Sequence, residues 1–103
     1  MNLKGALPML ILQVLREGPK HGYRIAAEIR HASEGVLEFR EGTLYPALHA
    51  HENHGLVESH EEIENGRRRR YYRLTEDGLK VLESERTEWR SVVSAVNVIL
   101  GEA

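Results

Sequence analysis

The segment Arg40-Glu41-Gly42-Thr43-Leu44-Tyr45-Pro46-Ala47-Leu48 begins the part of the chain, ending at Leu74, that decides the fold. This segment is typical of the start of a helix. A strand, an Asn65-Gly66 turn and a second strand follow it, and the second strand carries consecutive arginines from Arg67 to Arg70. The sequence therefore predicts a helix that lies next to a basic β-hairpin, and the remaining segments are expected to support this unit.

Length, composition and charge indicate one small domain with a packed core. The chain has 103 residues, of which 41% are hydrophobic, a content typical of a folded protein rather than a disordered one. The net charge of −2 argues against a protein that coats nucleic acid indiscriminately, but it leaves room for a local basic face. Because the chain has no cysteine, disulfides and thiolate metal sites are excluded.

The apolar run from Leu7 to Leu15 does not have the features of a membrane span or a secretory signal. It contains Pro8 and Gln13 and is too short to cross a bilayer. It also lacks the charged segment and the cleavage site that a signal peptide needs. We therefore expect a soluble cytoplasmic protein with no membrane association.

Two helices are predicted ahead of the opening segment. Apolar residues spaced three and four apart predict the first helix over 3–16, where Pro8 either begins the helix or kinks it. The second helix fits His21 to Ala32, and a short extended piece over Val36 to Phe39 follows it. These two helices are expected to form the support for the third.

The third helix is predicted from Gly42 to Asn53, with His54-Gly55 as its stop. Arg40 or Glu41 occupies the position where serine or aspartate would make a stronger cap. The first N–H groups of this helix are therefore expected to stay free for an external acceptor, and a DNA phosphate is one such acceptor.

The Asn65-Gly66 turn predicts the register of the hairpin. A two-residue loop of this kind is a type I′ turn, which pairs Glu64 with Arg67. Stepping outward gives Ile63–Arg68, Glu62–Arg69, Glu61–Arg70, His60–Tyr71, Ser59–Tyr72, Glu58–Arg73 and Val57–Leu74. All but one of the arginines then face a carboxylate, and Arg68 is the exception. Arg67 and Arg68 at the tip are best placed to contact DNA, while the alternative is a charge-laced hairpin with no partner.

A long last helix is predicted from Thr75 to Leu100. Thr75 is a suitable N-cap and the acidic residues after it favour the helix dipole. Such a helix has about 26 residues and is about 39 Å long. Leu79 and Leu82 are expected to cover the domain, whereas the later apolar stripe would remain exposed unless two chains pair through it. That stripe consists of Trp89, Val92, Val93, Val96, Ile99 and Leu100.

These elements together predict a mostly α fold with a small β-hairpin (α+β). The arrangement is a winged helix-turn-helix plus a long C-terminal dimerisation helix. The predicted domain boundaries are 1–75 for the DNA-binding unit and 76–103 for the dimerisation helix.

Four segments in this order and spacing carry a resemblance to a known family. They are 11–23 (ILQVLREGPKHGY), 42–49 (GTLYPALH), 55–57 (GLV) and 68–75 (RRRYYRLT). The chain resembles the PadR-type transcriptional regulators along nearly its whole length. Because a single helix follows the wing, the chain resembles the subfamily that lacks a longer C-terminal helical domain.

The resemblance implies a two-fold dimer that represses by binding a pseudo-palindromic operator in double-stranded DNA. The helix holding Thr43 and Tyr45 would enter the major groove, His21 and Tyr23 would lie beside the backbone, and the wing arginines would reach phosphates or a groove. The predicted DNA-binding residues are His21, Tyr23, Arg40, Thr43, Leu44, Tyr45, Pro46, Arg67 and Arg68. Alternatively, the two tyrosines pack against each other or against the core.

The chain departs from the family pattern after His49. Ala50, His51 and Glu52 stand where Arg, Leu and Glu are typical, so one basic residue is absent. His51 falls where an inward leucine is expected, and a buried imidazole needs a hydrogen-bond partner. His49 and His51 point about 200° apart on a helix and cannot share one ion. His51 and His54 are a different pair, and a metal-responsive regulator that uses them is an alternative.

We therefore expect a DNA-binding repressor that uses no cofactor. The alternative is a protein-interaction module that kept the fold but not operator binding. An enzyme is not expected, because apart from the histidine run at 49–54 the sequence has no nucleophile–base spacing and no phosphate-binding glycine motif. In part of the family a tryptophan like Trp89 lines an interfacial pore for flat aromatic compounds, so a small aromatic effector is a further expectation, with a ligand-free interface anchor as the alternative.

Overall fold

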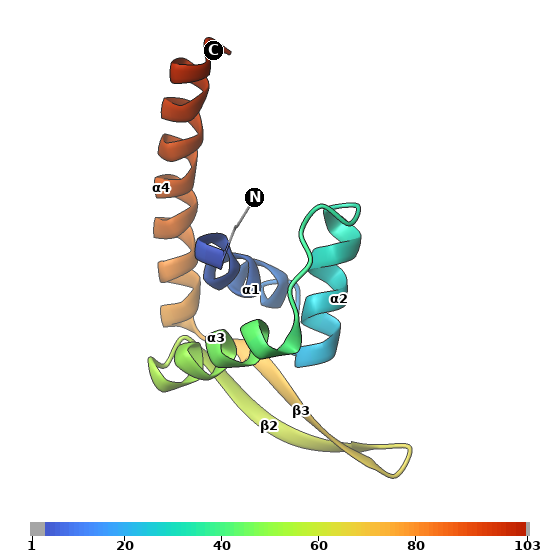
Figure 1. Cartoon of the computed structure of the whole chain (residues 1–103). Coiled ribbons are helices and arrows are strands. Elements are labelled where there is room, and N and C mark those ends of the chain that lie inside the picture. Colours follow the sequence, from blue (N-terminus) through green and yellow to red (C-terminus); the bar gives the residue numbers. More distant parts are fainter. Residues whose placement is uncertain (1–3, 103) are drawn as a thin grey trace.

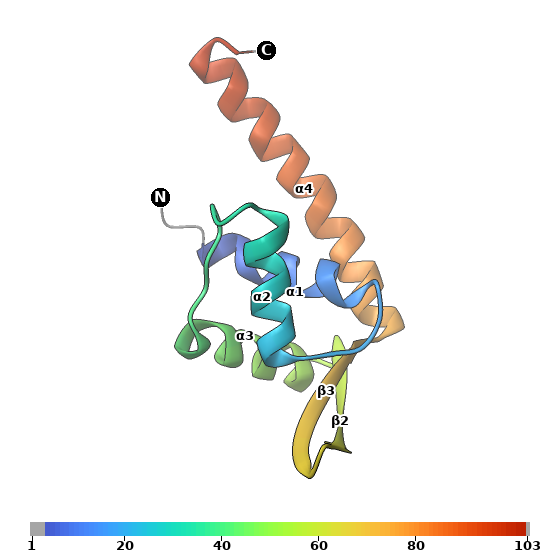
Figure 2. The same ribbon diagram turned by 90° about the vertical axis from the view of Figure 1, so that its right-hand side faces the viewer.

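The computed structural model describes residues 4–102 and confirms an α+β fold (Figure 1). Helices α1, α2 and α3 pack into a small body, from which the β2–β3 hairpin and helix α4 leave in roughly opposite directions (Figure 2). The elements are η1 (Lys4–Ala6), α1 (Leu7–Leu15), β1 (Lys20–His21), α2 (Gly22–Ala32), α3 (Glu41–Asn53), β2 (Val57–Glu64), β3 (Arg67–Leu74) and α4 (Glu76–Leu100).

Helix α1 begins at Leu7, with Pro8 in its first turn. Proline is tolerated there because the first N–H groups of a helix have no helical partner. Pro8 therefore lies at the start of the helix and does not kink it, which decides between the two alternatives. Lys4–Ala6 forms a single 3₁₀ turn before it, and the expected start at Leu3 lies outside the described residues.

The sheet contains a third strand in addition to the two strands of the predicted hairpin. This strand lies between α1 and α2. Val36 to Phe39, predicted as a short extended piece, has no regular secondary structure and pairs with no strand, and the backbone N–H of Leu37 donates to Ser33 Oγ at 3.0 Å. Instead, Lys20–His21 forms β1, which pairs with β3 in a sheet of order β1-β3-β2. Two residues are too few to show the alternating pattern of a strand, so this pairing depends on how α1 and α2 place the segment.

The register of the hairpin is the predicted one at every position, from Val57–Leu74 to Glu64–Arg67. Asn65 and Gly66 have φ values of 50° and 78°, as a type I′ turn requires. Side chains alternate between the two faces of a strand. One face therefore carries Ser59, Glu61, Ile63, Arg68, Arg70 and Tyr72, and the other carries His60, Glu62, Glu64, Arg67, Arg69 and Tyr71.

The core lies between the three helices and the base of the hairpin. Its fully buried side chains include Ile11, Leu12, Ile25, Leu44, Leu48, Val57, Tyr72 and Leu82. Leu82 on α4 covers the core as expected, but Leu79 is 39% exposed and Val81 packs against the core in its place. Leu79 and Leu82 are three residues apart, yet the start of α4 is rotated so that positions 78 and 82 face the body.

The start of α4 is tied to the base of the hairpin. Thr75 Oγ1 accepts a hydrogen bond from the N–H of Gly78 at 3.0 Å and donates one to the carbonyl of Gly55 at 2.7 Å. Gly78 lies so close to the hairpin that a Cβ placed on it would be 2.1 Å from the carbonyl oxygen of Leu56. The predicted N-cap therefore also positions the helix against the body.

Polar contacts join the first half of α4 to α1. Arg16 pairs with Glu83 at 3.2 Å, and Arg86 donates to Gln13 Oε1 at 3.1 Å. Beyond these contacts α4 leaves the body (Figure 1) and its large apolar side chains are exposed, namely Trp89, Val92, Val93, Val96, Val98, Ile99 and Leu100. In the described part of the chain, no helix is long and apolar enough to cross a membrane.

Candidate nucleic-acid interface

Helix α3 begins without a side-chain cap among the described residues, as its sequence predicts. Arg40 is its N-cap in an extended conformation, and its carbonyl accepts the N–H groups of both Thr43 and Leu44 at 2.9 Å. Arg40 and Pro46 are exposed and Thr43 is half-buried. Leu44 is among the predicted DNA-contacting residues, but it is fully buried and packs α3 against the core.

Tyr45 and Tyr23 have separate environments. A Cβ added to Gly22 would lie 2.7 Å from the Tyr45 ring, so this ring packs directly on the first turn of α2. Burial, assisted by the nearby Glu41 carboxylate, raises the pKa of Tyr45. Tyr23 is 65% exposed and its ring stacks on His21, with 6.4 Å between the ring centroids. Packing against the protein therefore describes Tyr45 but not Tyr23.

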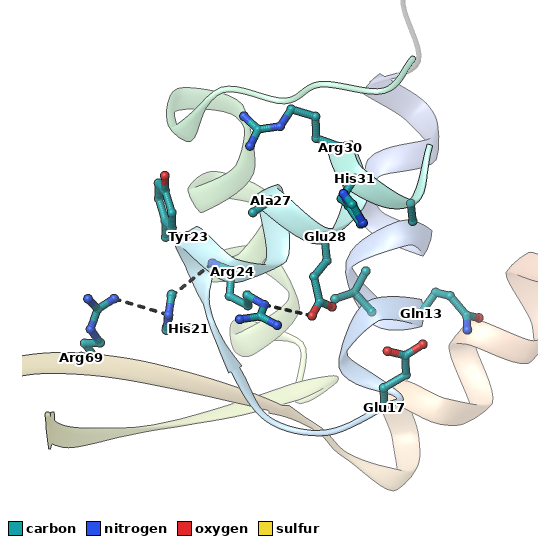
Figure 3. A pocket seen from close by; sticks show the side chains of 12 residues that line it. Gln13, Glu17, His21, Tyr23, Arg24, Ala27, Glu28, Arg30, His31 and Arg69 are labelled. Atoms are coloured by element: carbon teal, nitrogen blue, oxygen red, sulfur yellow. Dashed lines mark hydrogen bonds and ion pairs between the residues drawn. The ribbon is translucent and has the colours of Figure 1, made fainter. Parts of the chain in front are cut away.

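His21 joins α2 to the wing, the β2–β3 hairpin. Its Nδ1 accepts the backbone N–H of Arg24 at 3.1 Å, which caps α2, and its Nε2 lies 3.4 Å from Arg69 Nη1 (Figure 3). A neutral ring that accepts at Nδ1 carries its proton on Nε2, so in that tautomer two donors face each other. Burial, then the charge of Arg69, lowers the pKa of His21.

The ion pairs of the wing differ from those that the register alone predicts. Arg68, expected to lack an acid, lies 3.9 Å from Glu61, and Arg69 lies 3.8 Å from Glu64 rather than pairing with Glu62. Both contacts are diagonal, and diagonal neighbours on one face lie within reach of long side chains in a twisted hairpin. Within residues 4–102 it is Arg67, not Arg68, that has no ion pair among the wing arginines.

Arg70 is a candidate site residue that the sequence prediction missed. Its guanidinium donates to Glu61 Oε1 at 3.0 Å and to Ser59 Oγ at 2.9 Å, and Ser59 donates in turn to Glu52 of α3. With Arg68 it lines a hollow of about 210 Å³ that also includes Tyr45 and Gly22. The signal was present in the sequence, because Arg68 and Arg70 are two apart and share a face of the strand.

A larger hollow of about 830 Å³ lies along the outer face of α2 (Figure 3). The end of α1 contributes Gln13 and Glu17 to it, and the wing contributes Arg69. Arg24 is paired with Glu28 at 3.0 Å, and Arg30 is exposed on the same helix. With Glu17 and Glu28 also in its lining, this hollow carries charges of both signs.

The histidines of α3 do not form the metal arrangement considered as an alternative. His51 is 6% exposed, and its Nε2–H donates to the carbonyl of Pro8 at 2.9 Å, while His54 is exposed at the end of the helix. Across residues 4–102, no three His, Cys, Asp or Glu side chains are grouped to hold a metal ion. The expected buried imidazole therefore has its partner in α1.

Trp89 and Val92 line a cleft of about 420 Å³ between α4 and the start of α1. Glu85 and Glu88 lie on the α4 side of this cleft, and Pro8 and Met9 lie on the other. In the single chain Trp89 is 41% exposed. The predicted effector residue is thus placed beside a hollow with both apolar and acidic walls.

Two comparisons with known proteins agree on the class of this chain. A transcriptional regulator of Mycobacterium tuberculosis, Rv3488, is 34% identical over 86 residues, which cover 84% of this chain and 64% of that protein. The crystal structure of a PadR family transcription regulator from Clostridium difficile R20291 has a TM-score of 0.81 at 36% identity, covering 93% of this chain and 99% of the other.

Bacillus subtilis PadR, known in complex with operator DNA, has the same fold. Its TM-score is 0.71 at 24% identity, over 77% of this chain and 45% of that one. The model of the transcriptional regulator PadR-like family matches residues 11–84. Members of this family are transcriptional regulators and not enzymes. With a match over most of its length, this chain belongs to the PadR-like family of transcriptional regulators.

Proposed function

We propose that this protein is a cytoplasmic repressor that binds a pseudo-palindromic operator as a homodimer. The observation that carries the proposal is the exposed, side-chain-uncapped start of α3 beside the arginines of the wing. Bacillus subtilis PadR, which has this fold, binds operator DNA. In this proposal residues 1–75 contact DNA and residues 76–103 hold the dimer together.

The proposed DNA contacts divide by the chemistry of the side chains. Thr43 and Pro46 on α3 are the candidates for base edges, since they stand in the first turns of a helix that fits the major groove. Arg40, Arg67 and Arg68 are the candidates for phosphate contacts, because a guanidinium group can bind a phosphate through two parallel hydrogen bonds. His21, Tyr23 and Tyr45 flank these groups, and Leu44 supports the helix from the core.

The exposed stripe of α4 supports the dimer. Val92, Val93 and Val96 are 48%, 38% and 46% exposed in the single chain. A contiguous apolar surface of this kind is typical of an interface. Two-fold pairing of α4 would bring two copies of α3 to one DNA duplex, and two half-sites give an affinity that one small site does not reach.

The test is a fluorescence anisotropy titration of the purified dimer with a duplex enriched from random sequence by the protein itself. We expect binding that prefers this duplex over a shuffled one and that weakens steeply as salt rises, because each neutralised phosphate releases counterions. Binding that ignores both sequence and salt would sink the proposal. A dimer that binds no duplex would instead favour the interaction module, whose support is the extensive ion pairing of the wing.

A small aromatic effector is proposed at the cleft beside Trp89. Its support is the hollow of about 420 Å³ that this indole lines, at the edge of the proposed dimer helix. Trp89 is the only tryptophan, so its fluorescence reports directly on this site. Planar aromatic compounds should quench it at micromolar concentration, and the absence of quenching would leave Trp89 as an interface anchor without a ligand.

A further inference from the structure

Glu61 bridges two arginines of the wing. Its Oε1 accepts from Arg70 Nη2 at 3.0 Å, and its Oε2 lies 3.9 Å from Arg68 Nη1. The side chains of Arg68, Arg70 and Glu61 are 80%, 48% and 48% exposed. One carboxylate therefore lies within ion-pair distance of two guanidinium groups that are both accessible from solvent.

This cluster lies on the face of the wing that points toward α3. Arg70 also donates to Ser59, and Ser59 donates to Glu52 of α3, so side-chain hydrogen bonds connect this face to the helix. Arg68 and Arg70 share their hollow with Tyr45 of α3. The other ion pairs of the wing, Arg69–Glu64 and Arg73–Glu58, occupy the opposite face.

We propose that Glu61 competes with DNA phosphate for Arg68 and Arg70 and so lowers the affinity of the wing for DNA. The inference rests on the proposed DNA-binding function. A carboxylate and a phosphate present similar pairs of oxygens to a guanidinium group, so the two anions exclude each other from the same donors. A phosphate that binds the donors facing Glu61 therefore displaces this carboxylate at least in part.

The consequence of this competition is weaker binding to DNA of any sequence. Non-specific binding to DNA is almost entirely electrostatic, whereas specific binding adds contacts to base edges. A resident carboxylate weakens the electrostatic part, through competition and through repulsion of the approaching phosphate. Because both kinds of complex share this electrostatic part, Glu61 reduces the affinity for operator and unrelated DNA alike.

A purely stabilising role explains the two contacts of Glu61 less well than competition with phosphate does. Exposed pairs stabilise folded proteins only slightly, and many contribute nothing measurable. Glu58 provides a matched comparison, because it is paired with Arg73 on the neighbouring β3 strand and is also exposed, but it lies on the opposite face. A general effect of removing one negative charge would appear equally at Glu58 and Glu61.

The experiment compares the full-length wild type with Glu61→Gln and Glu58→Gln. Anisotropy titrations use a duplex enriched from random sequence by the wild-type protein and a shuffled duplex, each over a series of salt concentrations. We expect Glu61→Gln to bind the shuffled duplex about two- to fivefold more tightly, the range that an exposed ion pair allows. Binding to the enriched duplex should tighten by a similar factor, and Glu58→Gln should match the wild type on both.

Thermal melts of the three proteins check that each variant is folded. Equal binding by Glu61→Gln and wild type, weaker binding by Glu61→Gln, or the same gain in Glu58→Gln would overturn the inference while leaving operator binding intact. If neither the wild type nor Glu61→Gln binds any duplex at low salt, the proposed function fails and the inference fails with it. The two failures are thus distinguished by the wild-type titration.

Discussion

At the scale of single residues, His51 is a polar side chain that the fold has to accommodate. It is buried in α3, and its Nε2–H donates to the carbonyl of Pro8 in α1. His51→Ala should lower the free energy of unfolding by about 2 kcal/mol, since it leaves a cavity and removes a buried hydrogen bond. Urea unfolding followed by circular dichroism measures this loss.

His51→Leu is the matched variant. Leucine refills the space, and the carbonyl of Pro8 still has its position in the helical ladder of α1, where it faces the N–H four residues on. We expect a cost of less than about 1 kcal/mol. If leucine costs as much as alanine, the hydrogen bond rather than the packing is what His51 supplies.

His21 predicts a dependence of stability on pH. The groups that face its ring are Arg69 and Glu64 of the wing and Arg24 of α2, and burial is the largest cause of its lowered pKa. The folded state therefore favours the neutral ring. The stabilisation is complete above the ordinary pKa of about 6.5 and is lost as the pH falls through the lower pKa of the folded protein.

Thermal melts between neutral and mildly acidic pH check this prediction. In His21→Asn the amide oxygen still caps α2 but does not titrate, so the drop in melting temperature below the imidazole range should become smaller. An unchanged pH profile in this variant would assign the acid sensitivity to other groups. Asn is a suitable control because it removes only the titration and the ring contacts.

At the scale of elements, the start of α4 is decided by one close approach. A Cβ at Gly78 would lie 2.1 Å from the carbonyl oxygen of Leu56, a backbone atom that also accepts the N–H of Thr75 at 3.1 Å. Helix propensity alone predicts that Gly78→Ala stabilises by about 1 kcal/mol. We expect the opposite, a loss of about 3 kcal/mol, because α4 has to move away from the hairpin.

Ser84→Ala in the same helix is the control. Ser84 is exposed, so only propensity acts there, and the variant should be as stable as the wild type or slightly more stable. Urea unfolding of both variants separates the two effects. A stabilising Gly78→Ala would show that α4 does not dock as tightly as the structure describes.

The wing arginines are not equivalent, and their ion pairs rank them. Among the residues that the structure describes, Arg67 has no ion pair, whereas Arg73 is paired with Glu58. Arg67→Ala should weaken binding to all duplexes and reduce the slope of log affinity against log salt by about 1, as expected for one lost phosphate contact. Arg73→Ala should leave that slope unchanged.

Thr43→Ala on α3 should behave differently from Arg67→Ala. A side chain that contacts base edges changes which sequence is preferred rather than the response to salt. Anisotropy titrations with single-base variants of the enriched duplex measure this preference. A uniform loss over all variants would place Thr43 against the backbone instead.

At the scale of the whole molecule, the proposed dimer accounts for the length of α4. Val96 lies in the middle of the exposed stripe and Ser94 lies on the opposite side of the helix. Val96→Glu should convert the proposed dimer to a monomer, because a carboxylate buried against an apolar partner is costly. Ser94→Glu, which adds the same charge outside the stripe, should remain a dimer.

Sedimentation measures both variants, and the DNA titration then reports whether operator affinity is lost with the dimer. We expect Val96→Glu to bind the enriched duplex far more weakly than Ser94→Glu, since a monomer presents only one copy of α3 to the DNA. Dimeric Val96→Glu would show that another surface joins the chains.

The sequence was sufficient for features in which neighbouring residues determine the result. The Asn65-Gly66 turn demands positive φ at both positions, so the pairing of all eight residues of β2 follows from it. Thr75 is an N-cap because its hydroxyl reaches a backbone N–H within its own turn. The uncapped start of α3 likewise follows from the residues at Arg40 and Glu41.

The tertiary structure decided what depends on residues far apart in the chain. His51 finds its acceptor at Pro8, 43 positions away, β1 exists because the α1–α2 connection runs along β3, and Leu44 is turned into the core. Because the hairpin is twisted, Glu61 lies within ion-pair distance of Arg68, and Arg67 has no acidic partner in the described part of the chain. Local chemistry therefore determined which elements form and their register, whereas three-dimensional packing determined which charges remain available, because ion pairs depend on distances that sequence separation does not set.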